Sequence, residues 1–272
     1  MGSRSDPDRP ALSLFAEELR AARERAGMSR EDLAAKISYS ASLIGMVESC
    51  RRVPQAQFAA SCDEALGMPG TFARIQKRLR TLSFPESFRP FAEHEAAATS
   101  LRTFEHSLVP GLLQTAGYAR AVLATRPNTT EDEVEDLVAA RLERQAVLDR
   151  DSPPLLWSVT DEAVLHRPVG GKEVMRAQLL HLAEMADRPN VTVQVIPYSA
   201  GAHSGLLGAF VIADFGGAPG IAYLETAAEG ETVEEPSVVA QVALIFDTLR
   251  SEALPRTASR DLILKVAEER WT

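Results

Sequence analysis

Short stretches of helical periodicity, each followed by a residue that ends a helix, fill residues 11–66 and constrain the fold more than any other feature. Leu12, Phe15 and Leu19 recur at helical spacing, and Gly27 then supplies the left-handed conformation that ends a helix. Next come the segment SREDLAAKI, a turn and the segment SLIGMVE. Two helices of about nine residues joined by about four residues form the helix-turn-helix unit, whose second helix enters the major groove of DNA.

Five helices are expected within residues 11–82. Ser29 and Asp32 have the spacing of a capping box at the start of the second helix, and Gly67 is placed to end the fourth. The residues whose spacing predicts one small shared core are Leu12, Phe15, Leu19, Ala22, Ala26, Leu33, Ala34, Ile37, Ile44, Val47, Phe58, Cys62, Ala65, Leu66, Phe72, Ile75, Leu79 and Leu82.

The charge distribution agrees with a DNA-binding segment at one end of the chain. The net charge of −9 by itself argues against nucleic acid as a partner. However, residues 1–80 hold 13 Lys and Arg against 10 Asp and Glu, a net charge of +3, whereas the remaining residues hold 16 against 28, a net charge of −12. A mildly basic domain joined to an acidic one suits a regulator with its phosphate contacts in one domain. A few excess arginines are also common in helical segments that bind no DNA.

Composition predicts a cytoplasmic protein without a membrane segment. Hydrophobic residues make up 45% and charged residues 25% of the chain, as in ordinary globular domains. No apolar run approaches the roughly 18 residues that a membrane span needs, and residues 1–10 are too polar for a signal peptide, so we expect them to be disordered. Two cysteines, Cys50 and Cys62, are too few for a metal cluster and give no sign of secretion.

The segment GMSREDLAAKISYSASLIGMVESCRRVP resembles the helix-turn-helix of the xenobiotic-response-element (XRE) family, which is related to phage repressors. The resemblance covers residues 15–66 and implies a lambda-repressor-like five-helix domain. It also implies a mostly buried salt bridge between Arg23 and Glu48 that links the first helix to the third. The positions that it implies for DNA binding are Arg30, Lys36, Ser40, Ala41, Ser42, Gly45, Met46, Arg51 and Arg52.

Within that set, Arg30 is expected to touch phosphate and base, and Lys36, Arg51 and Arg52 are expected to hold phosphates. Phosphate contacts fix the register but read no sequence. The groove-facing residues, from Ser40 to Met46, are poor in bidentate hydrogen-bond donors. Direct readout should therefore be modest, with Arg30 and DNA shape contributing the rest.

Two positions depart from the family pattern. Cys50 occupies the place of a left-handed glycine, a conformation uncommon for residues with a side chain. Its thiol lies beside Arg51 and Arg52, whose charges favour a reactive thiolate. Gly45 lies inside the recognition helix, at a cost of about 1 kcal/mol relative to alanine. A domain of this type can also lose DNA binding and serve as a docking module, and this alternative stays open.

Residues 92–272 are expected to form a larger mixed α/β domain with a small sheet, after a linker at residues 83–91. LLWSV and VTVQVI flank the crossover helix GGKEVMRAQLLHLAEMA and should be parallel strands. GAFVIADF and IAYLET are joined by the short FGGAPG, which favours a hairpin. The other expected helices span residues 92–104, 115–125, 130–149, 236–253 and 259–271.

No catalytic or metal-binding constellation stands out in this region. The histidines lack metal-ligand spacing, and no G-x-S-x-G, P-loop or G-x-G-x-x-G motif is present. His203, in the connection SAGAHSGLLGAF, is the best single candidate for a ligand or proton-transfer role, although such a histidine is usually an ordinary loop residue. Glu95, Arg102 and Arg141 are expected on solvated helix faces. We therefore expect no catalytic residue, no cofactor and no enzymatic activity.

Three further segments resemble the C-terminal domain of actinomycete XRE regulators of the Scr antitoxin-like class. They are EAAATSLRTFEHSLVPGLLQTAGYARAVL, RLERQAVLDRDSPPLLWSVTDEAVLHRPVGG and RPNVTVQVIPYSAGAHSGLLGAF, of which VPGLLQT is the most specific part. The resemblance spans residues 84–271 and implies a transcriptional regulator, often encoded beside a small partner protein. In physical terms, Pro110 and Gly111 turn the chain into a helix whose Leu112 and Leu113 pack inward.

The leading hypothesis is a sequence-specific transcription factor that binds double-stranded DNA as a homodimer. One recognition helix contacts only a few base pairs, so tight binding usually needs two half-sites. The acidic domain would then sense an effector, bind a partner or hold the dimer together. The alternative is an antitoxin-like module that binds a small cognate protein encoded nearby and regulates its own promoter. An enzyme is the third hypothesis, and a pocket of titratable groups around His203 would favour it.

Overall fold

The computed structural model describes residues 9–82, 88–226 and 230–272. Most of the segment expected to be disordered and part of the expected linker lie outside these residues. The chain divides into two compact units, residues 1–84 with 135–140 and residues 85–134 with 141–272, and each is described by itself. The domain boundaries expected from the sequence stay predictions.

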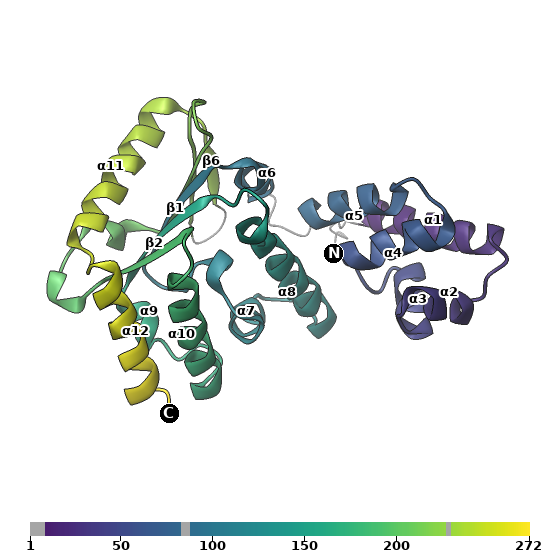
Figure 1. Cartoon of the computed structure of the whole chain (residues 1–272), viewed down its shortest axis with the longest axis horizontal. Coiled ribbons are helices and arrows are strands. Elements are labelled where there is room, and N and C mark those ends of the chain that lie inside the picture. The colour runs from purple at the N-terminus through teal and green to yellow at the C-terminus, as the bar shows by residue number, and fades with distance from the viewer. Residues whose placement is uncertain (1–8, 83–87, 227–229) are drawn as a thin grey trace. The chain divides into compact units, whose positions relative to one another are not determined.

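The N-terminal unit contains the five expected helices (Figure 1). Phe15, Leu19, Leu33, Ile44 and Phe58 are at most 1% exposed in its core, and Cys62 is fully buried beside them. The helices are α1 (Arg9–Arg25), α2 (Arg30–Ile37), α3 (Ala41–Glu48), α4 (Ala56–Leu66) and α5 (Thr71–Leu82).

The ends of these helices follow the sequence signals. Ser29 and Asp32 form the capping box, in which the Ser29 hydroxyl accepts from the Asp32 N–H at 3.0 Å and the Asp32 carboxylate accepts from the Ser29 N–H at 2.9 Å. Gly27 and Gly67 take the left-handed conformation after α1 and α4. Cys50 also takes it, at a φ of 56°, so this cysteine does occupy a position that favours glycine.

The C-terminal unit is a mixed α/β domain. Its strands are β1 (Ser100–Glu105), β2 (Leu155–Asp161), β3 (Val191–Ile196), β4 (Phe210–Asp214), β5 (Ile221–Leu224) and β6 (Glu231–Val233). The α-helices after α5 are α6 (Arg89–Ala97), α7 (Ala116–Leu123), α8 (Glu131–Gln145), α9 (Ala163–His166), α10 (Lys172–Ala186), α11 (Pro236–Glu252) and α12 (Arg256–Glu269), of which residues 135–140 of α8 count with the first unit. Short 3-10 turns are η2 (Gly111–Leu113), η3 (Ala146–Asp149), η4 (Tyr198–Ala200) and η5 (Ser204–Leu207).

The strands form one six-stranded sheet in the order β3-β2-β1-β4-β5-β6. β1, β2 and β3 are parallel, whereas β4, β5 and β6 each run antiparallel to the preceding neighbour in this order. The expected parallel pair around α10 and the expected hairpin of β4 and β5 are therefore confirmed. Leu112 and Leu113 of the VPGLLQT segment are also buried as expected.

The expected helix over residues 92–104 is wrong. The helix α6 begins earlier, at Arg89, and ends at Ala97, and residues 100–105 form the central strand β1. The segment LRTFE favours a strand because Thr and Phe have high β-propensity and its residues alternate between two faces. Pairing with β2 on one side and β4 on the other then buries β1. The short edge strand β6 was not expected from the sequence either.

The two faces of the sheet differ in character. Phe104, Val159 and Phe210 lie on one face and pack against Phe246 of α11. Tyr223 lies on the opposite face, where Phe88 and Phe91 at the start of α6 contact its ring. By strand alternation, this second face also carries Glu105, which is 8% exposed at the end of β1.

Gly205 tests the packing of the first face. A β-carbon at this position in η5 would overlap the ring of buried Phe104. We expect Gly205→Ala to lower the free energy of unfolding by about 1–3 kcal/mol, because overpacking displaces a core side chain. The matched control is Gly117→Ala in α7, where a β-carbon would meet Val174 at 3.7 Å, an ordinary contact. Denaturant unfolding in which both variants behave alike would contradict this packing.

Candidate nucleic-acid interface

α2 and α3 form the helix-turn-helix, joined by Ser38, Tyr39 and Ser40. Ser38 takes the left-handed conformation that ends α2. Ser40 caps α3, since its hydroxyl accepts from the Leu43 N–H at 3.1 Å. This hydroxyl therefore has a structural role at the start of the helix expected to enter the groove.

The two sides of α3 divide as the sequence predicts. Ile44 and Val47 are fully buried in the core. Ser42 and Met46 are exposed on the other side, and Ala41 and Gly45 are half-buried.

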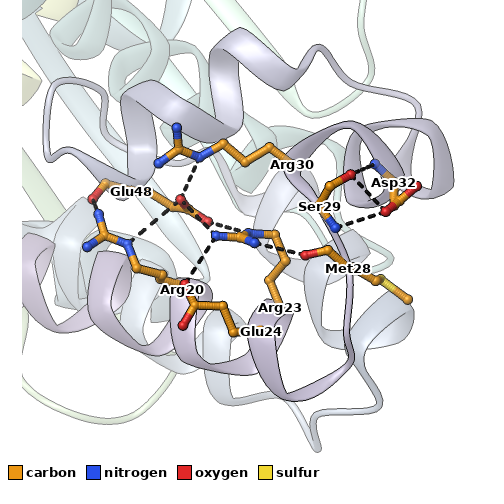
Figure 2. Close-up of polar contacts among 8 residues, drawn as sticks. All are labelled: Arg20, Arg23, Glu24, Met28, Ser29, Arg30, Asp32 and Glu48. Carbon is orange, nitrogen blue, oxygen red and sulfur yellow. Dashed lines mark hydrogen bonds and ion pairs between the residues drawn. The ribbon is translucent and has the colours of Figure 1, made fainter.

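The carboxylate of Glu48, at the end of α3, holds three arginines from two other helices (Figure 2). Arg23 of α1 donates from Nε to Oε1 at 2.7 Å and from Nη2 to Oε2 at 3.3 Å. Arg30 of α2 donates from Nε to Oε2 at 2.8 Å. Arg20 of α1 lies 3.9 Å from Oε2 and donates to the Glu48 backbone carbonyl at 2.9 Å. This Glu48 cluster (Arg20, Arg23, Arg30 and Glu48) ties α1, α2 and α3 together.

Burial and the nearby positive charges shift the pKa of Glu48 in opposite directions. The side chain of this residue is 0% exposed. Burial raises the pKa of this carboxyl, but hydrogen bonds and charge from Arg23 and Arg30 outweigh burial, so the pKa lies below its ordinary value. The hydrogen bond with Glu48 raises the pKa of Arg23 in turn. The cluster is therefore ionised, and it satisfies a buried charge with bidentate geometry.

Arg30 differs from Arg23 in its access to solvent. Its side chain is 44% exposed, whereas that of Arg23 is 10% exposed. The Arg30 guanidinium lies against the recognition helix, where a β-carbon at Gly45 would meet its Nη1 at 3.6 Å. Glu48 therefore holds Arg30 beside the exposed face of α3 while leaving part of its guanidinium open.

The remaining expected phosphate contacts lie at two places. The Lys36 ammonium is exposed and donates to the Ala65 carbonyl at 2.7 Å, which caps the end of α4. Arg51 and Arg52 follow Cys50 in the loop after α3, where the Arg51 N–H closes the helix by donating to the Met46 carbonyl at 2.8 Å. No finding tests the DNA contacts expected of these residues, and they stay predictions.

His203 lies in the C-terminal unit with its side chain 1% exposed. Its Nε2 is 2.9 Å from the Asp161 Oδ2, and its ring packs edge-on against Phe104. Its Nδ1 is buried and has no hydrogen-bond partner among the described residues. An external ligand would have to displace neighbouring side chains to reach the ring, so the geometry supports a buried structural role better than a ligand role.

The expectation of solvated faces for Glu95, Arg102 and Arg141 is wrong. Glu95 is 1% exposed and receives a bidentate pair from Arg144 at 2.6 and 3.0 Å. Arg102 lies on the strand β1 and pairs with Asp214 at 3.1 Å. Arg141 donates to Gln114 at 2.7 Å. Helical spacing could not reveal these partners, because each lies far away in sequence.

The described residues contain no group of three or more His, Cys, Asp or Glu side chains that could hold a metal ion. Within the same residues, every helix is too short or too polar to cross a membrane.

Comparison with known families gives two matches. Residues 14–74 match a helix-turn-helix domain, and residues 88–265 match a domain of unknown function, DUF5753. The second match covers more than half of the chain. This chain belongs to the DUF5753 family. No curated protein and no solved structure matches it.

The two matches say different amounts about the two units. The helix-turn-helix match indicates a DNA-binding regulator, and it contains the whole Glu48 cluster. The DUF5753 match begins at residue 88, so it includes α6 and Phe88, the residue before that helix. The function of this domain has to be argued from its own side chains.

Removal of the central carboxylate should destabilise the N-terminal unit. We expect Glu48→Ala to lower the free energy of unfolding by about 2–4 kcal/mol, because it leaves Arg23 buried without its partner while Arg30 returns to water. Glu24→Ala is the control, since Glu24 is exposed and its Oε1 lies 3.7 Å from Nη2 of Arg23. Thermal or denaturant unfolding measures both variants. Equal losses of unfolding free energy in the two would show that the Glu48 cluster does not stabilise the N-terminal unit.

The cluster also predicts a dependence on pH. The pKa of Glu48 is lowered in the folded state. Its contribution to stability is therefore present above the unfolded pKa of about 4.3 and is lost as the pH falls through the lower folded value. The difference in unfolding free energy between the wild type and Glu48→Gln should shrink as the pH falls through this range. A difference that stays constant from pH 7 to pH 3 would contradict the assignment.

Proposed function

We propose that this chain is a sequence-specific transcriptional regulator of the XRE type that binds double-stranded DNA through α3. The observation that carries the proposal is the exposed face of α3, with Ser42 and Met46 open to solvent and Arg30 held beside it by Glu48. A helix presented in this way matches the geometry in which a recognition helix enters the major groove.

Charge near α3 supports the same proposal. Arg30 is exposed beside Gly45 and Glu48 in the second half of α3, and Arg51 is exposed in the loop that follows the helix. Arg52 lies in the same loop and pairs with Asp136 at 3.1 Å. Guanidinium groups placed around a recognition helix bind phosphates and fix its register, whereas the few polar groups on the helix read bases. We expect the sequence preference to be modest and the dependence on salt to be steep.

We further propose that the regulator acts as a homodimer, because one α3 reads only a few base pairs. The DUF5753 domain exposes large apolar side chains that support a contact with a second copy. Leu206 and Leu207 of η5 are 54% and 93% exposed, and Leu244 of α11, the helix against which η5 packs, is 68% exposed. Exposed apolar side chains are typical of protein-binding surfaces where they gather in one patch.

A second function is favoured by the same leucines and by the acidic composition of this domain. In that account the chain is an antitoxin-like module of the Scr class, which binds a small cognate protein and regulates its own promoter. Light scattering of the purified chain separates the two, because a homodimer has twice the chain mass without any added protein. Both accounts describe a cytoplasmic regulator rather than an enzyme.

The phosphate contacts can be tested with a duplex selected from a random DNA library at low ionic strength. We expect Arg51→Ala and Arg52→Ala each to weaken binding to all sequences alike and to lower the salt slope by about 1. Ser42→Ala and Met46→Ala should instead change the sequence preference. Fluorescence anisotropy across several salt concentrations measures both effects.

Arg74→Ala on α5 is the matched control, because Arg74 is exposed and, among the described residues, its side chain bonds to the Pro69 carbonyl and the Thr71 hydroxyl alone. We expect it to leave affinity and salt slope unchanged. A sequence preference altered by Arg51→Ala, or a loss of affinity equal to that in Arg74→Ala, would contradict the proposed division of roles.

A further inference from the structure

The sheet of the DUF5753 domain reverses its direction of growth at β1. The chain adds β2 and β3 on one side of β1 and then crosses to add β4, β5 and β6 on the other side. In open α/β sheets, ligands bind beyond the carboxyl ends of the strands at such a reversal. In this domain the carboxyl end of β1 is Glu105.

Strand pairing places a row of side chains on the same face as Glu105. Thr160 of β2 is its direct neighbour on one side. On the other side, the pairing of Phe104 with Phe210 continues to Ala209, whose carbonyl accepts from the Glu225 N–H at 3.0 Å. Glu105 and Glu225 therefore lie two strands apart, about 10 Å between Cα atoms, with the small Ala209 between them.

Glu105 is a mostly buried carboxyl without a hydrogen-bond partner among the described residues. It is 8% exposed, and its side chain forms no hydrogen bond or ion pair with any described residue. The neighbouring Thr160 hydroxyl and the Ser158 hydroxyl on the same face are also buried without a hydrogen bond among those residues. Buried polar groups are nearly always bonded, so a cluster of exceptions needs an explanation.

Arg141 of α8 supplies the opposite charge. It is partly buried, and its one hydrogen bond to a described residue goes from Nη1 to the Gln114 Oε1 at 2.7 Å. Gln114 is 2% exposed and is itself fixed by donating to the Val109 carbonyl at 2.6 Å. The VPGLLQT segment therefore positions Arg141, and it leaves the other guanidinium N–H groups without a partner among the described residues.

The charges of this region are coupled. Burial and the charge of Glu225 raise the pKa of Glu105 well above its usual range, and Arg141 lowers it. Burial, with Arg144 and Arg126 nearby, lowers the pKa of Arg141 to about 10. Carboxyls thus gather at the strand ends and guanidiniums at α8, yet Glu105 and Arg141 do not form an ion pair with each other.

We propose that Glu105 and Arg141 bind a small zwitterion, an α-amino acid or the end of a short peptide, with its ammonium group at Glu105 and its carboxylate at Arg141. The two carboxyls of the row suit an ammonium group, and the arginines near α8 suit a carboxylate, which guanidinium binds with two parallel hydrogen bonds. The Thr160 hydroxyl is placed to accept from the same ammonium group. This proposal concerns the DUF5753 domain and does not depend on DNA binding.

A ligand role and a structural role make opposite demands on Glu105. A structural carboxyl stabilises the fold through its partners, whereas a buried carboxyl kept for a ligand makes the free protein less stable than it could be. The isosteric variant Glu105→Gln removes the ionisable carboxyl and keeps the shape of the side chain. This variant therefore distinguishes the two roles before any ligand is known.

The first experiment measures the melting temperature of the full chain with the twenty free α-amino acids, their carboxamides and their N-acetyl forms, each at millimolar concentration. Binding to the folded state raises the melting temperature by mass action. We expect at least one free amino acid to raise it, and we expect its carboxamide and its N-acetyl form to have no effect. A panel without any shift would overturn the proposal, and an equal shift by the carboxamide would remove Arg141 from the site.

The second experiment uses calorimetry with the amino acid so identified. We expect Glu105→Gln and Arg141→Gln each to weaken binding about tenfold or more, because each removes a charge-assisted hydrogen bond. Asp187→Asn is the control, since the Asp187 carboxylate, on the surface at the end of α10, pairs with Arg260 and with no other described residue. Binding that survives both variants unchanged would overturn the proposal.

The third measurement is the stability of Glu105→Gln without ligand at neutral pH. We expect its melting temperature to equal or exceed that of the wild type. A loss of several degrees would show that the carboxylate supports the fold and would overturn the proposal. DNA binding by Glu105→Gln is expected to be intact, so failure here and failure of the regulator proposal give different results.

Discussion

The buried carboxylate of Glu48 is the interaction on which the N-terminal domain depends. Three helices meet at this group, and two of them, α2 and α3, have only eight residues each, a length that is marginal for a helix without tertiary contacts. Arg23 neutralises the charge inside the domain, and Arg30 does so at its edge. One acidic side chain at the end of α3 thereby fixes the helix and holds a partly exposed guanidinium beside it. This arrangement orients the helix before any DNA arrives, so that less ordering is required on binding.

The DUF5753 domain uses burial of charge in a different way. Its pairs Glu95–Arg144 and Arg102–Asp214 are satisfied and join elements distant in sequence. Glu105, at the reversal point of the sheet, is not satisfied by any described residue. A well-bonded ion pair can join distant elements, whereas a buried polar group without a partner costs stability. This contrast within one domain separates its structural charges from its candidate functional charges.

Local signals in the sequence predicted most of the secondary structure. The capping box of Ser29 and the alternation of strands and helices around α10 are encoded within a few residues, and the structure contains both. The strand β1 was missed because it follows shortly after a helix, and because it forms a strand by pairing with β2 and β4, which are distant in sequence. The same limit applies to the sites. Arg23 and Glu48 were expected from a family resemblance. The hydrogen bond from Arg30 to the same carboxylate and the electrostatic coupling of Glu105 with Arg141 depend on the tertiary fold. No spacing rule could reveal them.

The central claim is that the exposed side of α3 meets nucleobases. Its most direct test is photo-crosslinking of the full chain with a benzophenone side chain at position 42, or at position 74 as a control, to duplexes recovered from a random library at low ionic strength. The account predicts crosslinks to bases from position 42 and none from position 74. Equal crosslinking from both positions, or a purified chain that binds no duplex under these conditions, would contradict it.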